Sequence, residues 1–397
     1  MSQSAVGRRF SLPAQVTMLT ITRTIINTGF RMVYPLLPVF ARGIGADVAA
    51  FSVILTILQL LGLAAPFFGQ LSEGRGKRFT IRFGLFLYLI AMLLVFISPN
   101  FVGFSAALIV ASLGKIAFDP AVHAYIGDRV PYDKRGLYMG IVEFGWSGAF
   151  IVGVPIMSWL IAQTNWQMPF FVLAILTGIM LIATFIMIEE DEGRVVSGIS
   201  LWQGVRQAIN SPIARAGLLL GAGISGANQL ITVVFGLWIE DSFGIQLAAL
   251  AIASAVIGIS ELAGEGVVTG FSDRFGKRRL IILAIIANML ACLVLPFTAI
   301  TLSTALVGLF AFYLSFEIAL VATIPLASEL SPQSRGMYLT VFIAAVTFGR
   351  TIATPLSTAL FTWGLLANTL MALVFNAVAL MAVWSLAGKV DQHQGRT

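Results

Sequence analysis

Cysteine and histidine are almost absent from this chain, and their scarcity excludes several kinds of site. The 397 residues hold one cysteine and two histidines. A single thiol cannot form an intrachain disulfide, and Cys292 lies in an apolar run. Two histidines are too few for a His-rich metal centre, and no HExxH motif or Walker loop is present. The sequence therefore predicts no metal, no cofactor and no enzymatic activity.

Charge is equally scarce. Charged residues make up 11% of the chain, against roughly 25% in a soluble domain. Hydrophobic residues make up 58%, and the mean hydropathy is +0.94. This composition is typical of a membrane protein that crosses the bilayer many times. The net charge of +6 does not indicate a nucleic-acid partner, because the basic residues are predicted to lie along one membrane face.

The apolar runs between polar segments predict the membrane spans. A helix needs about 20 residues to cross the hydrocarbon core, and these runs are too continuous for barrel strands. The first run holds Arg23 and Arg31 and is too long for a cleaved secretory signal. The twelve predicted spans are 13–40, 47–72, 79–98, 101–127, 136–162, 168–188, 213–240, 246–271, 279–299, 303–328, 335–362 and 365–388.

The basic residues predict the orientation of these spans. Most of the 24 lysines and arginines fall in the N-terminus, the even-numbered connections and the C-terminus. Arg42 falls in an odd-numbered loop. Cytoplasmic loops carry an excess of Lys and Arg, so both termini are expected in the cytoplasm and the chain in the cytoplasmic (inner) membrane.

Two short motifs repeat at the same interval. EGRGKR at 73–78 returns as DRFGKR at 273–278, and RGLYM at 135–139 returns as RGMYL at 335–339, each with an offset of 200. The chain is therefore predicted to be an all-α membrane protein of two pseudo-symmetric six-helix bundles, residues 1–188 and 213–397, joined by a cytoplasmic linker at 189–212. Such repeats are typical of transporters that bind substrate between the repeats, near the bilayer midplane.

Twelve spans in two halves and a charged turn after spans two and eight resemble the major facilitator superfamily, whose turn pattern is G-x-L-a-D-r-x-G-r-k. In the first turn Glu73 takes the place of the usual Asp as an acidic match, and Gly74 takes the place of the usual Arg; in the second turn Thr269 replaces the leading Gly. The matching residues are Gly69, Leu71, Glu73, Gly76, Lys77 and Arg78 in the first half, and Asp273, Arg274, Gly276, Lys277 and Arg278 in the second.

The resemblance implies that these turns latch the two halves in one conformational state. Simple anchoring of the topology is the alternative role for the basic residues. Glu143 lies near the inner end of span five and is expected to join the latch, with Arg129 or Arg135 as its partner. The residues assigned to conformational gating are Glu73, Asp273, Arg78, Arg278, Arg135, Arg335 and Glu143.

Charged residues inside spans are the best candidates for the transport site. Each would cost about 2.5–3.5 kcal/mol facing lipid, so they must pair or line a wet cavity. Arg23, Asn27 and Arg31 recur every four residues, which places them on one helix face. The resemblance implies a cavity lined by spans 1, 4, 7 and 10. The substrate-binding candidates are Arg23, Asn27, Arg31, Lys115, Asp119, Gln229, Trp238 and Arg350.

Proton coupling is assigned to two of the buried acids. Glu317 has no basic neighbour within a turn of its own helix, and a carboxyl group buried without a partner is easier to protonate. Asp119 is the second candidate, although Lys115 and Asp119 could form a purely structural pair. His123 is expected to make a satisfied polar contact, with a proton relay as the alternative.

These features together predict a secondary active transporter that moves a small organic solute by alternating access, coupled to the proton gradient. GWSGAFIVGVP at 145–155 loosely resembles the antiporter signature of drug exporters, which favours efflux of drug-like or amphipathic compounds. Small residues in this segment could equally serve close helix packing. The alternatives are transport of organic anions or sugar-like solutes, or a channel or lipid scramblase. Expected partners are the substrate and the bilayer, and the protein is expected to be a monomer.

Overall fold

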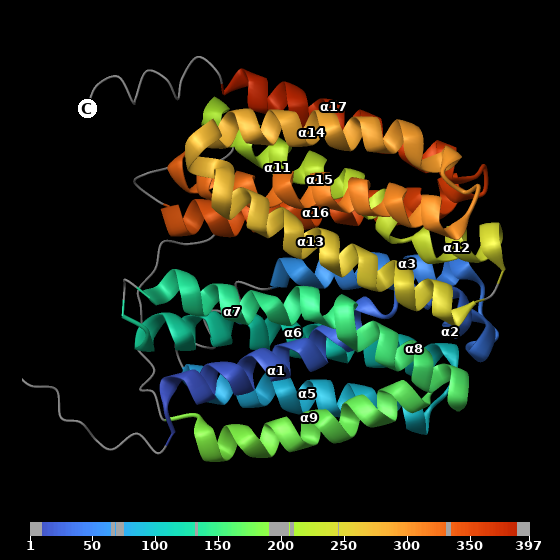
Figure 1. Ribbon diagram of the computed structural model, residues 1–397. Helices are drawn as coiled ribbons and strands as arrows, with labels where there is room; N and C mark the ends of the chain where they lie inside the picture. Colours follow the sequence, from blue (N-terminus) through green and yellow to red (C-terminus); the bar gives the residue numbers. More distant parts are fainter. Residues whose placement is uncertain are drawn as a thin grey trace, which may run out of the picture. The chain divides into compact units, whose positions relative to one another are not determined.

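The computed structural model describes residues 10–64, 68, 75–131, 134–189, 206, 210–244, 246–330 and 335–386. Within these ranges every regular element is a helix (Figure 1). The first half contains α1 Leu12–Arg31, α2 Leu37–Ile44, α3 Val48–Leu61, η1 Gly62–Ala64, α5 Lys77–Ile97, α6 Phe101–Arg129, α7 Arg135–Gly148, η3 Ala149–Gly153, α8 Val154–Gln163 and α9 Met168–Met187. The second half contains α11 Pro212–Thr232, α12 Phe235–Phe243, α13 Leu247–Phe275, α14 Lys277–Val294, η4 Leu295–Phe297, α15 Leu302–Glu329, α16 Arg335–Phe361 and α17 Leu365–Ser385.

The lengths and composition of these helices confirm the predicted fold class, an all-α membrane protein. Among the described residues, ten helices are long and apolar enough to cross a membrane, or eleven if the bent pair around residue 45 is one span. The sequence predicted twelve spans. The remaining one is α1, which has 20 residues but is less apolar because it carries Arg23, Asn27 and Arg31.

The internal repeat predicted from the sequence is visible in the helix boundaries. Helices α1, α5 and α7 begin at residues 12, 77 and 135, and α11, α14 and α16 begin at 212, 277 and 335. The two GKR turns share one backbone conformation, because Gly76 has a φ of 89° and Gly276 a φ of 79°. Only glycine adopts this region readily, which explains why both copies keep it.

Two of the predicted spans, 13–40 and 213–240, each contain a break between two helices, although Pro212–Phe243 as a whole is long and apolar enough to cross a membrane. Helix α1 ends at Arg31 and α2 starts at Leu37, since Pro35 and Pro38 interrupt the backbone ladder. Helix α11 ends at Thr232 and α12 starts at Phe235 after two β-branched valines. The breaks fall at corresponding positions of the two halves.

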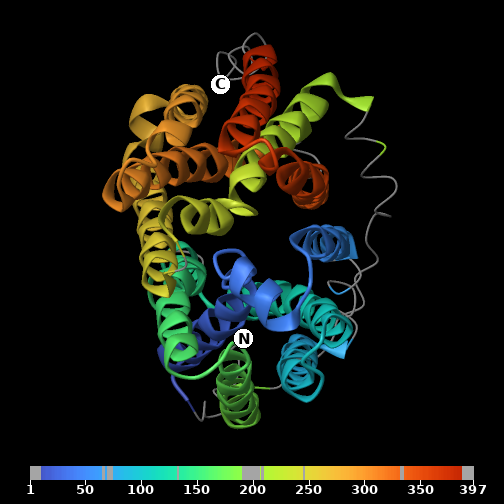
Figure 2. The same ribbon diagram turned by 90° about the vertical axis from the view of Figure 1, so that its right-hand side faces the viewer.

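The described helices belong to two compact units. Figure 2 shows the same helices after a turn of 90° about the vertical axis of Figure 1. Unit 1 comprises Met1–Val33, Gly43–Gly45 and Ala64–Ser197, and unit 2 comprises Tyr34–Arg42, Ala46–Leu63 and Gly198–Thr397. Residues 34–63 were predicted to belong to the first bundle, yet 34–42 and 46–63 belong to unit 2. There Ser52 of α3 accepts a hydrogen bond from Thr358 Oγ1 at 2.8 Å. The division into two bundles of six consecutive helices thus stays a prediction.

Helices α5 and α6 of unit 1 cross at two glycines. A Cβ atom on Gly84 would lie 2.6 Å from the carbonyl oxygen of Gly114, and one on Gly114 would lie 2.7 Å from that of Gly84. Backbone atoms cannot rotate away as a side chain can, so both positions require glycine, whose side chain is a single hydrogen atom. Small residues allow this kind of close approach between membrane helices.

Substituting alanine for Gly114 is therefore expected to lower the free energy of unfolding by about 1–3 kcal/mol, the usual cost of overpacking. Thermal unfolding of the purified variant in detergent measures this. Gly178 of α9 is the matched control, because a Cβ there would meet nothing within 4 Å. Gly178→Ala should be neutral or slightly stabilising. Equal melting temperatures for the two variants would contradict the close crossing.

Candidate functional site

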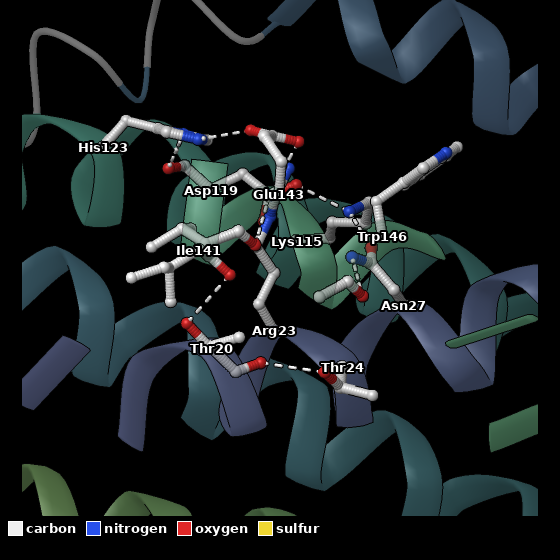
Figure 3. A network of polar contacts seen from close by, with 12 residues as sticks. Thr20, Arg23, Thr24, Asn27, Lys115, Asp119, His123, Ile141, Glu143 and Trp146 are labelled. Carbon is white, nitrogen blue, oxygen red and sulfur yellow. Dashed lines mark hydrogen bonds and ion pairs between the residues drawn. The ribbon is translucent and has the colours of Figure 1, made fainter. Parts of the chain in front are cut away.

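A network of ionisable side chains lies inside unit 1, where α1, α6 and α7 pack together (Figure 3). Its centre is Arg23, near the middle of the 20-residue helix α1, with 6% of its surface exposed. Lys115 and Asp119 extend from the 29-residue helix α6, and Glu143 extends from α7. Arg23, Lys115 and Asp119 are mostly buried, with side chains 7%, 16% and 21% exposed, so their charges depend on one another for stabilisation, whereas Glu143 is 42% exposed.

Asp119 receives two of the cations. Lys115 Nζ lies 2.6 Å from Asp119 Oδ2, and Arg23 Nε lies 3.5 Å from Asp119 Oδ1. Lys115 also donates to Asn27 Oδ1 at 2.5 Å, which links α6 back to α1. The predicted i, i+4 pair is therefore present, but it is one edge of a larger network rather than an isolated structural pair.

Glu143 joins the network from the opposite side. Arg23 Nη1 lies 2.9 Å from Glu143 Oε2, and His123 Nε2 lies 2.9 Å from Glu143 Oε1. His123 Nδ1 contacts the carbonyl oxygen of Asp119 at 2.9 Å. The expected partners of Glu143 were Arg129 or Arg135; Arg129 Nε lies 3.9 Å from Glu189 Oε2, and the side chain of Arg135 is outside the described residues.

The formal charges of this network cancel. Two basic side chains, Arg23 and Lys115, face two acidic ones, Asp119 and Glu143. His123 extends the network, because its ring bridges Glu143 and the carbonyl oxygen of Asp119.

Arg31 lies two turns along α1 from Arg23 and contacts aromatic rings instead of these carboxylates. Its Cζ atom lies 4.2 Å from the centre of the Trp146 ring and 3.6 Å from that of Phe150. Its Nη1 donates to the carbonyl oxygen of Trp146 at 2.9 Å. Lys115 Nζ approaches the same Trp146 ring at 5.6 Å. Cation–π contacts of this kind fix a guanidinium in place.

The glycine-rich segment 145–155 shapes both parts of the site. Gly145 lets α7 approach Arg23, because a Cβ there would lie 3.0 Å from Arg23 Cβ. Its carbonyl oxygen accepts from Asn27 Nδ2 at 3.0 Å. The helix then passes through the π-helical turn η3, which carries Phe150. Gly153 packs against Thr28 of α1. Gly145 and Gly153 therefore serve close helix packing, which was the alternative to the antiporter signature for this segment.

Trp146 and Phe150 were missed by sequence reasoning. The available signal was Trp146, which follows Glu143 by three positions, so Glu143 and Trp146 lie on one face of the helix. The pattern was read only for its glycines. The contacts to the carbonyl oxygens of Val142, Gly145 and Trp146 could not be predicted, because any residue type supplies a carbonyl.

The candidates in the second half lie in unit 2. Gln229 Nε2 donates to Thr354 Oγ1 at 3.1 Å, and Trp238 is buried on α12. Glu317 is 6% exposed on α15, and the missing Cβ of Gly264 on α13 makes room for its side chain. Arg350 is half-buried on α16.

The gating candidates are only partly described. Glu73 and the side chains of Asp273, Arg135 and Arg335 lie outside the described residues. Arg278 Nε donates to the carbonyl oxygen of Val383 at 3.4 Å, and Arg78 lines a cleft beside α9. The neighbouring lysines show a repeated pairing within each unit. Lys77 pairs with Asp128 at the end of α6, and Lys277 pairs with Glu329 at the end of α15.

Comparison with known proteins agrees with this architecture. A sequence profile described as Major Facilitator Superfamily matches residues 19–327. YwfA, named an uncharacterized MFS-type transporter of Bacillus subtilis (strain 168), is 27% identical over 406 residues, covering 94% of both chains. Quinolone resistance protein NorA of Staphylococcus aureus is 23% identical over 185 residues, covering 46% of this chain and 47% of NorA.

Solved structures share the fold at low sequence identity. A bacterial homologue of the human lysosomal transporter Spinster, in an inward-facing and occupied conformation, has a TM-score of 0.72 at 14% identity and covers 97% of this chain and 98% of its own. A POT family transporter in complex with a thioalcohol-conjugated peptide has a TM-score of 0.76 at 12% identity and covers 94% and 95%. The family profile spans well over half of the residues, and the relatives are transporters rather than enzymes. The chain therefore belongs to the Major Facilitator Superfamily and is an integral membrane transporter.

Proposed function

We propose that this protein is a proton-coupled antiporter that exports drug-like or amphipathic compounds across the cytoplasmic membrane. The observation that carries the proposal is the charge-balanced network of Arg23, Lys115, Asp119, His123 and Glu143 inside unit 1. A buried network of this kind is costly to build and is expected at a working site. Resistance to quinolones, which the name of NorA states for that relative, supports export of drug-like compounds.

The proton is proposed to act through the two ends of the network. Glu143 contacts both Arg23 and His123, so a change in either contact would loosen the position of Arg23. In unit 2, Glu317 keeps the coupling role predicted for it, because it is a buried carboxyl group on α15. The broken helices α1–α2 and α11–α12 support this class of mechanism, since interrupted helices at corresponding positions mark transporter binding sites.

Proteoliposomes test the proposal. Purified protein reconstituted with an acid interior should accumulate a cationic amphipathic dye, because protons leaving the vesicle would drive the dye inward. The accumulation should collapse when a protonophore removes the gradient. Dye entry at the same rate with and without the gradient would contradict proton antiport.

Transport of organic anions is the second candidate, and Arg31 is the observation that favours it. Its guanidinium is held against Trp146 and Phe150, an arrangement suited to a flat carboxylate-bearing solute. Gln229, Trp238 and Arg350 in unit 2 are retained as proposed binding residues for either substrate class.

Substituting alanine for Arg31 is expected to weaken anion binding by roughly 10–100-fold, the equivalent of one charge-assisted hydrogen bond. Binding is measured by the thermal shift of purified protein against a panel of organic anions. Arg31→Lys is the control, because it keeps the charge and loses the planar stacking, and it should recover part of the affinity. Unchanged anion affinity in Arg31→Ala would remove this candidate.

A further inference from the structure

A second basic site lies in unit 1, away from the buried network. A cleft of about 510 Å³ opens between α5 and α9, at the end where α5 begins and α9 ends. Figure 1 shows these two helices side by side. Arg75, Arg78 and Arg82 line it together with phenylalanines of both helices, and none of the described residues that line it is acidic.

Two of the arginines are held by aromatic rings. Arg82 Cζ lies 3.9 Å from the centre of the Phe185 ring, and Arg82 Nη2 donates to the carbonyl oxygen of Thr184 at 2.9 Å. Arg75 Cζ lies 5.5 Å from the Phe79 ring. Stacked guanidinium groups present planar donors in a fixed direction, which suits the oxygens of a phosphate.

The lining of the cleft changes from basic to aromatic along α5. A helix rises about 1.5 Å per residue, so Arg82 lies about 8 Å and Phe86 about 14 Å from the start of α5 at Lys77. Three of the lining phenylalanines remain largely exposed: Phe79 at 40%, Phe86 at 51% and Phe185 at 59%. Because α5 is a candidate span that starts at Lys77, we expect Arg75 and Arg78 to lie near the phospholipid headgroups and Phe86 to lie nearer the acyl chains.

The second repeat shows that the fold does not require these residues. At the offset of 200, GKRFTIRFGLF at 76–86 corresponds to GKRRLIILAII at 276–286. Arg82 is replaced by Ile282, and Phe83 by Leu283. The shared GKR serves the turn in both halves, whereas the additional arginine and the aromatic residues occur in the first copy.

We propose that this cleft binds an anionic phospholipid, with the phosphate against Arg75, Arg78 and Arg82 and one acyl chain along Phe83 and Phe86. Basic clefts at the membrane surface attract anionic lipids with about 1 kcal/mol per arginine, equivalent to about fivefold in affinity.

Native mass spectrometry of the purified full-length protein tests this site with phosphatidylglycerol and phosphatidylcholine as probes. Wild-type protein should bind phosphatidylglycerol more tightly. Arg82→Gln should lower that affinity about fivefold and Arg75→Gln with Arg82→Gln about 25-fold, with phosphatidylcholine unchanged. Arg279→Gln is the matched control, because this exposed arginine lies at the equivalent end of α14 and should have no effect.

Three results would overturn the proposal. An equal loss in Arg279→Gln would show unspecific attraction to charge, and unchanged phosphatidylglycerol affinity in the double variant would show that the cleft is not the site. Displacement of the lipid by an equal concentration of glycerol phosphate would identify a site for soluble phosphates instead. Because Arg82 bonds to the backbone of α9, Arg75→Gln alone provides the readout if Arg82→Gln fails to fold.

Discussion

Arg23→Gln is expected to abolish transport and to lower the free energy of unfolding by about 3–5 kcal/mol, the usual cost of removing one partner from a buried ion pair. Arg23 contacts Asp119, Glu143 and the carbonyl oxygen of Val142. Glutamine keeps much of the volume but removes the charge. Asp119 would then keep Lys115 and Glu143 would keep His123, but the network would lose the cation that joins its two carboxylates.

Thermal unfolding in detergent measures the stability loss, and Arg42→Gln is the matched control. Arg42 is another arginine with an acidic partner, Glu240, but its side chain is 45% exposed against 7% for Arg23. An exposed pair contributes at most about 1 kcal/mol. If the two variants unfold at the same temperature and Arg23→Gln still transports, the buried network has no special role.

Glu317→Gln is expected to reduce gradient-driven transport to the background of protein-free vesicles. Glutamine has nearly the same shape but cannot gain or lose a proton, so it removes coupling with little change in packing around Gly264. Exchange of substrate across the membrane without a proton gradient should survive, because exchange does not require net proton movement. The measurement is uptake by proteoliposomes with and without an imposed pH gradient.

Glu329→Gln on the same helix is the control for this prediction. Glu329 lies at the end of α15, where it pairs with Lys277 at the surface, and its loss should leave gradient-driven uptake intact. Uphill transport that continues in Glu317→Gln would remove this residue from the coupling role. Loss of exchange as well would indicate damage to substrate binding rather than to coupling.

Much of the fold was predictable because the repeat is marked by short local motifs, namely the glycine turns and the helix starts that follow them. Gly76 and Gly276 take the positive φ that their turns require, and the helices after them start 200 residues apart. The break after Arg31 was also accessible, since Pro35 and Pro38 are visible in the sequence. The break between α11 and α12 follows only two valines, which continuous helices tolerate, so tertiary packing decides it.

The candidate site was predictable only within single helices. Spacing by four residues placed Arg23 with Asn27 and Lys115 with Asp119 on shared faces. Which face meets which depends on contacts that spacing does not encode. Gly145 brings α7 against Arg23, and this approach places Glu143 beside Arg23, a contact that spacing along one helix does not predict.

The pH change inside proteoliposomes on addition of substrate tests the central claim most directly. With a pH-sensitive dye trapped inside and the membrane potential clamped at zero, an outward proton movement should accompany inward movement of substrate. The account predicts a fixed ratio of protons to substrate in the wild-type protein and no proton signal in Glu317→Gln. Substrate entry without any proton movement in the wild-type protein would contradict the account.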